Sequence, residues 1–386
     1  MKKLLFRCHQ IFSLLKFLLL KIFSSTFINK YKNYWLISER GDEARDNGYA
    51  FYKYLKKEHP EVKVKYVITK DSPDISKIDK EDIVYLNSIK HHKLYISSSY
   101  LISTHLYGYS PEFRVFSRLS RKTSFFNGRG KKIFLQHGIT IANIPELYYK
   151  NTNLDLFIAG AYPEYLYINN TFGYPEGIVK YTGFARYDSL IKEESNYILY
   201  MPTWRKELFH TSSNEEFIQT DYYKNIINIL NNEYLNKTLK DNNLKLLFYP
   251  HYEIQKFIDS FSSNENVIIA SKDKYDISEL LRNCKMLITD YSSVLFDVAY
   301  LKKPMAFYQY DYESFKSNHY NQGYFDYKRD GFGPVIDNSN DLIDYVDKVI
   351  KSNFKMDDEY LKKVNNTFTL NDNNNCKRIY EEIIKL

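Results

Sequence analysis

Cysteine is scarce in this 386-residue chain. The three cysteines, Cys8, Cys284 and Cys376, are odd in number and far apart along the sequence. This spacing fits neither a disulfide framework nor a zinc site. We therefore expect a reducing, cytosolic setting rather than an oxidising one.

A long uninterrupted apolar run is also missing. The N-terminal segment MKKLLFRCHQIFSLLKFLLLKIFSS is rich in leucine, but Arg7, Lys16 and Lys21 divide it. No stretch reaches the roughly 20 apolar residues of a membrane span, and no small-residue cleavage site marks a signal peptide.

The same segment does have helical periodicity. One broad helical face carries Leu4, Leu5, Cys8, Ile11, Phe12, Leu15, Leu18, Leu19, Ile22 and Phe23. The other face carries Lys3, Arg7, Gln10, Ser13, Lys16 and Lys21. The pattern favours a basic amphipathic helix that lies in a membrane interface. The alternative is a core helix packed on the first domain.

Familiar nucleotide-binding loops are absent. The sequence has no G-x-G-x-x-G and no Walker loop, which argues against a nicotinamide enzyme and a P-loop NTPase. It also has no D-x-D, so a metal-clamped diphosphate is not indicated, and we expect neither a metal nor a cofactor. Arginine, histidine and a helix N-terminus would have to stabilise any diphosphate charge.

Charge of one sign is not concentrated. The formal net charge of +7 is mild for this length. It suits an anionic substrate or an anionic membrane surface, and it is too weak and scattered to indicate nucleic acid. No RNA-binding signature is present.

What the chain has instead is a regular alternation of short apolar runs and helical patterns. Strands are predicted at 34–38, 62–69, 82–86, 100–104, 132–136 and 155–160, and again at 197–202, 244–250, 266–271, 285–289 and 304–309. Helices are predicted at 46–58, 219–240 and 276–284, with a last one at 340–351. Such alternation is typical of parallel βαβ units.

The restart near residue 197 predicts an α/β protein with two Rossmann-like domains facing across a cleft. We place a membrane-interface helix at 1–30 and the two Rossmann-like domains at 31–190 and 191–386. The polar segment 189–196 is the expected hinge. The length suits two cores better than one.

Polar clusters follow four of the predicted strands. His137 and Gly138 follow the fifth strand, and Thr203, Trp204 and Arg205 follow the seventh. His251 follows the eighth strand, and Asp290, Tyr291, Ser292 and Ser293 follow the tenth. Because ligands of such folds bind at the carboxyl ends of the strands, these clusters predict a site to which both domains contribute.

Each cluster has a functional and a purely structural interpretation. A neutral His137 could take a proton from an attacking hydroxyl, or its ring could cap the next segment. His251 could serve the site or be an ordinary loop histidine. Arg205 offers a planar fork for phosphate oxygens, or it forms a surface salt bridge, for example with Glu207.

The turn TDYSS is predicted to open a helix. Ser292 or Ser293 could act as its N-cap, and the helix N-terminus could also hold a phosphate. Asp290 cannot favour a phosphate, so it needs another partner, such as a ribose hydroxyl or a backbone group.

Taken in order, LQHGIT, TGFARYD, MPTWR, YPHYE and ITDYSSVLFDVAYLKKP resemble the CDP-glycerol glycerophosphotransferase family of teichoic acid synthesis. The resemblance covers roughly residues 30–385. It implies a GT-B-like fold and peripheral attachment to the cytoplasmic face of the cell membrane. It also implies transfer of a polyol phosphate from a CDP-activated donor to a lipid-linked saccharide acceptor, with 31–190 as the acceptor domain and 191–386 as the CDP-donor-binding domain.

The resemblance assigns site residues by position. His137 matches the family's catalytic histidine and His251 its second important histidine. The residues expected to bind the donor are Gln136, Gly138, Arg186, Thr203, Trp204, Arg205, Asp290, Ser292 and Ser293. The short N-terminal region is expected of a primase or single-unit transferase rather than a long polymerase.

Two other functions compete with this one. A GT-B glycosyltransferase that uses a nucleotide sugar would share the architecture, and a non-catalytic scaffold of a polymer-assembly complex would show no turnover. The sequence leaves the polyol, the acceptor and the oligomeric state open.

Overall fold

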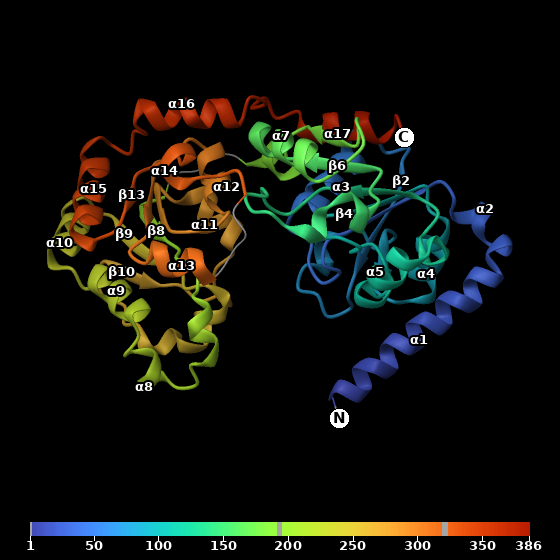
Figure 1. The fold of residues 1–386 in the computed structure, drawn as a ribbon, viewed down its shortest axis with the longest axis horizontal. Coiled ribbons are helices and arrows are strands. Elements are labelled where there is room, and N and C mark those ends of the chain that lie inside the picture. Colours follow the sequence, from blue (N-terminus) through green and yellow to red (C-terminus); the bar gives the residue numbers. More distant parts are fainter. Residues whose placement is uncertain (1, 191–194, 319–322) are drawn as a thin grey trace. The chain divides into compact units, whose positions relative to one another are not determined.

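The computed structural model of the chain describes residues 2–190, 195–318 and 323–386, with side chains from residue 7 onward and without those of 317 and 318. The chain forms two compact units (Figure 1). Unit 1 comprises Met1–Ile139, Ile144–Ser189 and Leu370–Leu386, and unit 2 comprises Thr140–Asn143 and Leu190–Thr369.

The C-terminal end corrects the sequence-based domain limits, which ran the second domain to residue 386. Residues 370–386 belong to unit 1 instead. Asp188 explains why, because its carboxylate accepts the backbone N–H groups of Asn375 and Cys376, at 2.8 and 2.7 Å. These groups open α17 (Asn375–Ile383), so the carboxylate satisfies donors that a helix N-terminus leaves free.

Unit 1 is built on a seven-stranded parallel sheet with the order β3-β2-β1-β4-β5-β6-β7. Its strands are β1 (Tyr34–Ser38), β2 (Lys63–Ile68), β3 (Ile83–Tyr85), β4 (Tyr100–Ser103), β5 (Lys131–Phe134), β6 (Leu156–Ala159) and β7 (Val179–Tyr181). The six strands predicted here are confirmed. The edge strand β7 was missed, because three residues with a central lysine carry little apolar signal.

The helices of unit 1 cover this sheet. They are α1 (Lys2–Ile22), α2 (Ile28–Tyr31), α3 (Asn47–Glu58), α4 (Ile89–Ser97), α5 (Phe113–Lys122), α6 (Tyr149–Thr152), α7 (Tyr162–Thr171) and α17, with 3₁₀ turns η1 (Ser24–Thr26), η2 (Ile75–Lys77), η3 (Ser124–Phe126), η4 (Pro145–Leu147) and η5 (Ala185–Ser189). The predicted helix 46–58 is confirmed, with Asp46 as its N-cap.

Unit 2 repeats the design with a six-stranded parallel sheet in the order β10-β9-β8-β11-β12-β13. Its strands are β8 (Tyr197–Tyr200), β9 (Lys245–Phe248), β10 (Val267–Ile269), β11 (Met286–Thr289), β12 (Met305–Tyr308) and β13 (Val335–Ile336). The five strands predicted here are confirmed. The two-residue β13 was missed because it is too short to show a pattern.

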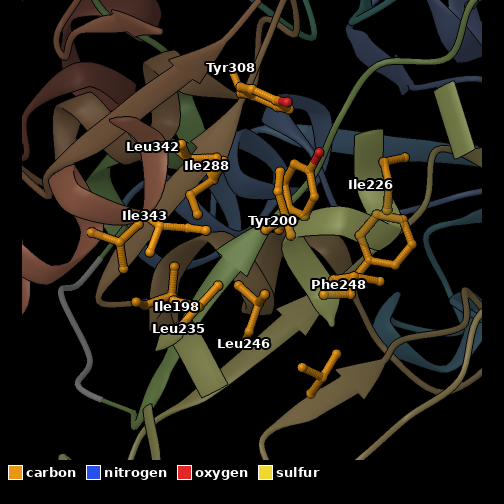
Figure 2. Close-up of a cluster of buried hydrophobic side chains, with 14 of the residues drawn as sticks. Ile198, Tyr200, Ile226, Leu235, Leu246, Phe248, Ile288, Tyr308, Leu342 and Ile343 are labelled. Carbon is orange, nitrogen blue, oxygen red and sulfur yellow. The ribbon is translucent and has the colours of Figure 1, made fainter. Parts of the chain in front are cut away.

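The core of unit 2 lies between this sheet and its helices. Alternate strand residues point to one face, and Figure 2 shows Ile198, Tyr200, Leu246 and Phe248 in this layer. Helices α9 (Asp221–Leu230), α10 (Glu233–Asp241) and α15 (Ser339–Lys351) add apolar side chains such as Leu342. Such burial is the main source of stability for a parallel sheet that is covered on its faces.

The helices of unit 2 depart from the sequence prediction in two places. They are α8 (Asn214–Phe217), α9 (Asp221–Leu230), α10 (Glu233–Asp241), α11 (Ile277–Asn283), α12 (Leu295–Tyr300), α13 (Tyr312–Asn318), α14 (Tyr327–Asp330), α15 (Ser339–Lys351) and α16 (Asp358–Thr367), with 3₁₀ turns η6 (Lys206–His210) and η7 (Tyr252–Ser260). The helix predicted over 219–240 is two helices. The second begins after Asn232, whose side-chain Oδ1 accepts the Leu235 N–H at 2.9 Å and caps α10. Helix α15 is not the last one, since α16 and α17 follow.

Helix α1 confirms the predicted helix and presents its apolar face to solvent. Its contact side buries Ser13 and Phe17, and the Phe17 ring packs 5.1 Å from that of Phe116. The exposed apolar residues are Ile11, Phe12, Leu15, Leu19, Ile22 and Phe23, between 49% and 72% exposed. Among the helices that the structure describes, none is long and apolar enough to cross a membrane.

Candidate active site

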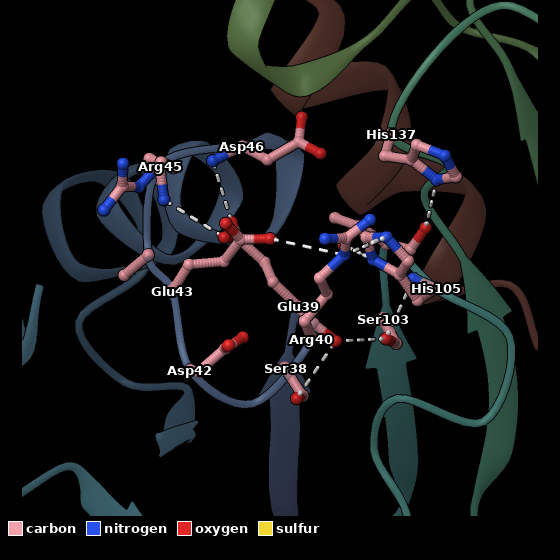
Figure 3. A network of polar contacts seen from close by, with 12 residues as sticks. Ser38, Glu39, Arg40, Asp42, Glu43, Arg45, Asp46, Ser103, His105 and His137 are labelled. Atoms are coloured by element: carbon pink, nitrogen blue, oxygen red, sulfur yellow. Dashed lines mark hydrogen bonds and ion pairs between the residues drawn. The ribbon is translucent and has the colours of Figure 1, made fainter. Parts of the chain in front are cut away.

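In unit 1 the loops after β1, β4 and β5 bring polar side chains together at the carboxyl ends of the strands (Figure 3). His137 follows β5, His105 follows β4 and Arg40 follows β1. The imidazole rings of His105 and His137 stack almost in parallel, with centroids 4.3 Å apart and planes 6° apart. The predicted catalytic histidine therefore has a second histidine as its neighbour.

The hydrogen bond of His137 defines its tautomer. Its Nδ1 lies 3.3 Å from the carbonyl oxygen of Thr104. A carbonyl only accepts hydrogen bonds, so Nδ1 carries the proton and Nε2 keeps its lone pair. Desolvation lowers the pKa of His137 below its ordinary value, and the charges of Arg186 and Arg40 lower it further. These features suit a general base that acts through Nε2.

Gln136 corrects one sequence prediction. It was expected to bind the donor, but it is buried, and its Nε2 donates to the Ile158 carbonyl at 2.7 Å and to Glu164 at 3.1 Å. Its φ of 58° also places Gln136, rather than Gly138, in the left-handed region. Gln136 thus turns the chain after β5 and aims His137 outward, while Gly138 follows at the part-exposed surface.

Arg186 lies in η5 and is tied to the start of α3. Its Nη1 donates to Asp46 Oδ1 at 2.9 Å, and its backbone N–H donates to Asn47 Oδ1 at 3.1 Å. The amide nitrogen of Asn47 also donates to the Gln136 carbonyl at 2.7 Å. Asn47 therefore couples the segments that carry Arg186 and His137, so the structure brings these two predicted residues into one network.

Glu39 holds the loop that carries Arg40. It is fully buried, and its carboxylate accepts the backbone N–H groups of Arg45, Asp46 and Tyr49 at 2.8–3.0 Å. Burial, with the charge of Asp46, raises the pKa of Glu39 to about 8, while these N–H groups favour the charged form. The side-chain oxygens of Glu39 thereby cap the start of α3 and fix the turn after β1.

Sequence reasoning missed Arg40, Asp46, Asn47 and His105. A signal was present, because ERGDEARDN follows β1 and STH follows β4. The rule that polar residues at strand ends mark a site was applied to four strands only. Extended to every strand, it would have included them.

In unit 2 the residues after β8 and β11 form a buried ion-pair network. Arg205 is 1% exposed, and its Nη1 donates to Asp290 Oδ2 at 2.9 Å. Its Nε and Nη2 donate to the two carboxylate oxygens of Asp311, at 2.5 and 3.1 Å. Two carboxylates therefore hold the Arg205 guanidinium inside unit 2. This differs from both expectations, a contact with a donor phosphate and a surface salt bridge with Glu207.

The same network supplies the missing partner of Asp290. Its Oδ1 accepts the backbone N–H groups of Thr203 and Tyr291, at 2.8 and 2.6 Å. Asp290 thus joins the loop after β8 to the loop after β11, with both carboxylate oxygens accepting from protein groups. Its assignment to the donor stays a prediction. Thr203 is likewise buried, with its backbone held on both sides by this network.

His251 is the N-cap of η7 and has the opposite tautomer to His137. Its Nδ1 accepts the backbone N–H of Glu253 at 3.3 Å, so its proton lies on Nε2. Its ring stacks on part-buried Trp204 with centroids 6.2 Å apart, and desolvation lowers its pKa. A neutral Nε2–H is a donor that suits charge developing on a phosphate oxygen.

The serine turn differs from the predicted helix cap. Helix α12 begins at Leu295, and its N-cap is Val294, without a side-chain hydrogen bond. Ser292 Oγ accepts only the Val294 N–H, at 3.4 Å, and Ser293 is exposed. Because α12 has six residues, its dipole offers little to an anion. Any contribution of this turn to anion binding would therefore come from the hydroxyl groups of Ser292 and Ser293.

One acidic group among the described residues has the spacing of a metal site, namely Asp79, Glu81 and Asp82. Lys56 and Lys65 neutralise Asp82 at 2.8 and 2.7 Å. We therefore interpret this group as part of an ion-pair network. The absence of a catalytic metal stays a prediction.

Residues 19–385 match the family CDP-Glycerol:Poly(glycerophosphate) glycerophosphotransferase. The chain belongs to this family. The resemblance found in the sequence is thereby confirmed.

Curated relatives agree with this placement. The minor teichoic acid biosynthesis protein GgaB of Bacillus subtilis is 37% identical over 375 residues, which are 94% of this chain and 40% of GgaB. The teichoic acid glycerol-phosphate transferase of Staphylococcus aureus is 33% identical over 152 residues, 39% of this chain and 36% of that protein. The chain spans less than half the length of these relatives.

Solved structures show the fold. The wall teichoic acid polymerase TagF has a TM-score of 0.68 at 19% identity, with 97% of each chain covered. A UDP-GlcNAc 2-epimerase from Neisseria meningitidis has a TM-score of 0.55 at 13% identity, with 92% of this chain and 100% of that chain covered. The predicted α/β, GT-B-like class with two parallel sheets is confirmed.

Proposed function

We propose that the chain transfers glycerol phosphate, or a related polyol phosphate such as ribitol phosphate, from a CDP-activated donor. The acceptor is a hydroxyl group of a membrane-lipid-linked saccharide, and the product enters a teichoic acid or capsule-type polymer. Membership of the glycerophosphotransferase family supports this proposal. The observation that supports it most directly is the hydrogen bond from His137 Nδ1 to the Thr104 carbonyl, which leaves the lone pair of Nε2 able to act as a base.

In the proposed reaction the acceptor oxygen attacks the phosphorus that bears the polyol. Nε2 of His137 takes the hydroxyl proton, and the bond from this phosphorus to the bridging oxygen breaks. CMP leaves with the electron pair of that bond. Such transfers depend on positioning and electrostatic stabilisation more than on covalent work by the protein.

We assign the donor phosphates to unit 2. Nε2–H of His251 and the hydroxyl groups of Ser292 and Ser293 are the groups there that can donate hydrogen bonds to phosphate oxygens. Trp204 offers an aromatic face beside His251. Arg205 and Asp290 hold the two loops that carry these groups in place.

We propose peripheral attachment to the cytoplasmic face of the membrane through α1. The exposed apolar face of α1 would lie in the lipid interface. Helix α5, which packs on α1 through Phe116, adds exposed cationic residues for anionic headgroups. These are Arg114, Arg118, Arg121 and Lys122.

The experiment is a donor panel. The purified chain is incubated with lipid-linked acceptor and, in turn, CDP-glycerol, CDP-ribitol and several nucleotide sugars, and the released nucleotide is identified. We expect CMP with a CDP-polyol alone. Release of a nucleoside diphosphate from a nucleotide sugar would establish a glycosyltransferase, and no release from any donor would favour a scaffold.

A further inference from the structure

The neighbour of His137 has both ring nitrogens occupied. Nε2 of His105 lies 3.1 Å from Nε of Arg40. A guanidinium only donates hydrogen bonds, so His105 Nε2 accepts and His105 is neutral. Its Nδ1 proton then points to Thr104 Oγ1 at 2.9 Å. With no free lone pair, His105 cannot serve as a base itself.

Thr104 anchors both rings of the stack. Its hydroxyl group accepts from His105 Nδ1, and its carbonyl accepts from His137 Nδ1. The backbone before it is also fixed, because Ser103 Oγ accepts the His105 N–H at 3.2 Å and donates to the Glu39 carbonyl at 3.3 Å. The plane of His105 is therefore set by the fold, and this plane limits how the His137 ring can turn.

The charges around His137 oppose its protonation. Arg40, from the loop after β1, and Arg186, from η5, both lower the pKa of His137. Three acidic side chains of this region are already engaged: Glu39 by backbone N–H groups, Asp46 by Arg186, and Glu43 by Arg40 at 3.7 Å. The fourth, Asp42, is exposed to solvent. His105 adds no compensating charge, since desolvation and its neighbours lower its pKa to about 3.

We propose that His105 and Arg40 are positioning residues for His137: His105 holds the catalytic ring in the plane that presents Nε2, and Arg40 holds His105 through its Nε2, which places the guanidinium charge beside the stacked rings. This inference rests on the proposed role of His137 as general base. It assigns Arg40 no contact with substrate.

The test for Arg40 is a titration that needs no substrate. Protein labelled with ¹³C at histidine Cε1 is titrated by NMR, with His137→Gln identifying the His137 signal. We expect Arg40→Gln to raise the titration midpoint of His137 by about half a pH unit or more, because an opposing charge is removed. Arg129→Gln is the matched control, an exposed arginine before β5 at the other end of the strands. An unchanged midpoint in Arg40→Gln overturns the role of Arg40.

Kinetics then separate positioning from substrate binding. The acid limb of kcat/KM should move upward with the titration midpoint in Arg40→Gln, with KM unchanged within about threefold. A large rise in KM at an unchanged midpoint would mean that Arg40 binds substrate. The titration can be measured even if the protein does not turn over CDP-polyols. Failure of the proposed function and failure of this inference therefore give different results.

His105 is tested by substitutions that keep or remove its flat ring. We expect His105→Ala to lower kcat about 10- to 100-fold with little change in KM, because His137 loses its fixed orientation. His105→Phe, which keeps a flat ring, should recover part of that loss. A folded His105→Ala variant with wild-type kcat overturns the positioning role.

Discussion

Asp290 Oδ2 and Arg205 Nη1 lie 2.9 Å apart, and each side chain is only 2% exposed. A buried charge that keeps its partner is tolerated, whereas one that loses it is strongly destabilising. This pair joins the loops after β8 and β11, and Asp311 closes the network on the other side of the guanidinium. The aspartate of the TDYSS turn therefore holds two loops of unit 2 together.

The first prediction concerns the stability of unit 2. Arg205→Ala should lower the free energy of unfolding by about 3–5 kcal/mol, because the buried Asp290 and the part-buried Asp311 would lose their cation. Chemical denaturation followed by circular dichroism measures this change. Lys240→Ala, which removes an exposed pair with Glu265, is the control and should change stability by less than about 1 kcal/mol. Equal effects of the two substitutions would contradict the buried-network interpretation.

The second prediction concerns His137. His137→Ala should lower kcat by about 10² to 10⁴-fold while the protein still folds, because the base is lost. His137→Gln should behave similarly, since glutamine can donate to the Thr104 carbonyl but cannot take a proton. Normal turnover by either folded variant would remove His137 from the mechanism.

The third prediction is the pH dependence of the wild-type enzyme. The base must be neutral, and the pKa of His137 is lowered below the ordinary value. Hence the acid limb of kcat/KM should be centred below pH 6.5, the ordinary value for histidine. An acid limb centred above pH 6.5 in a kcat/KM profile would contradict the geometry around His137.

The fourth prediction concerns the serine turn. Ser292→Ala/Ser293→Ala should weaken donor binding about tenfold in a calorimetric titration, because neutral hydrogen-bond donors are lost. Since neither serine caps α12 by its side chain, stability should change by less than about 0.5 kcal/mol. The opposite pattern, with unchanged donor binding and a lower stability, would restore the plain capping role.

The fifth prediction concerns α1. Phe12→Glu/Leu19→Glu should abolish co-flotation with phosphatidylglycerol vesicles, because both side chains are about 60% exposed and would carry charge into the interface. Tyr234→Glu, an equally exposed aromatic position in unit 2, is the matched control and should leave flotation unchanged. Undiminished flotation of the double variant would place the membrane contact elsewhere.

The sequence by itself determined the class of fold. The strands predicted at 34–38 and 285–289 were found because parallel strands covered on both faces read as continuous apolar runs. Helix 46–58 was found because Asp46 caps it. Short edge strands such as β7 and β13 could not be predicted, since two or three residues show no periodicity. The ordered motifs likewise sufficed for the family.

Only the tertiary structure decided what the polar residues do. Arg205 and His137 both follow strands and look alike in the sequence, yet one is buried between Asp290 and Asp311 and the other is exposed. The difference comes from residues distant in the chain, because Asp290 and Asp311 reach Arg205 across neighbouring strands of one sheet. His105 reaches His137 in the same way. Such contacts cannot be predicted from the residues next to each position in the chain. The sequence therefore indicated the strand ends but not which of their side chains are buried.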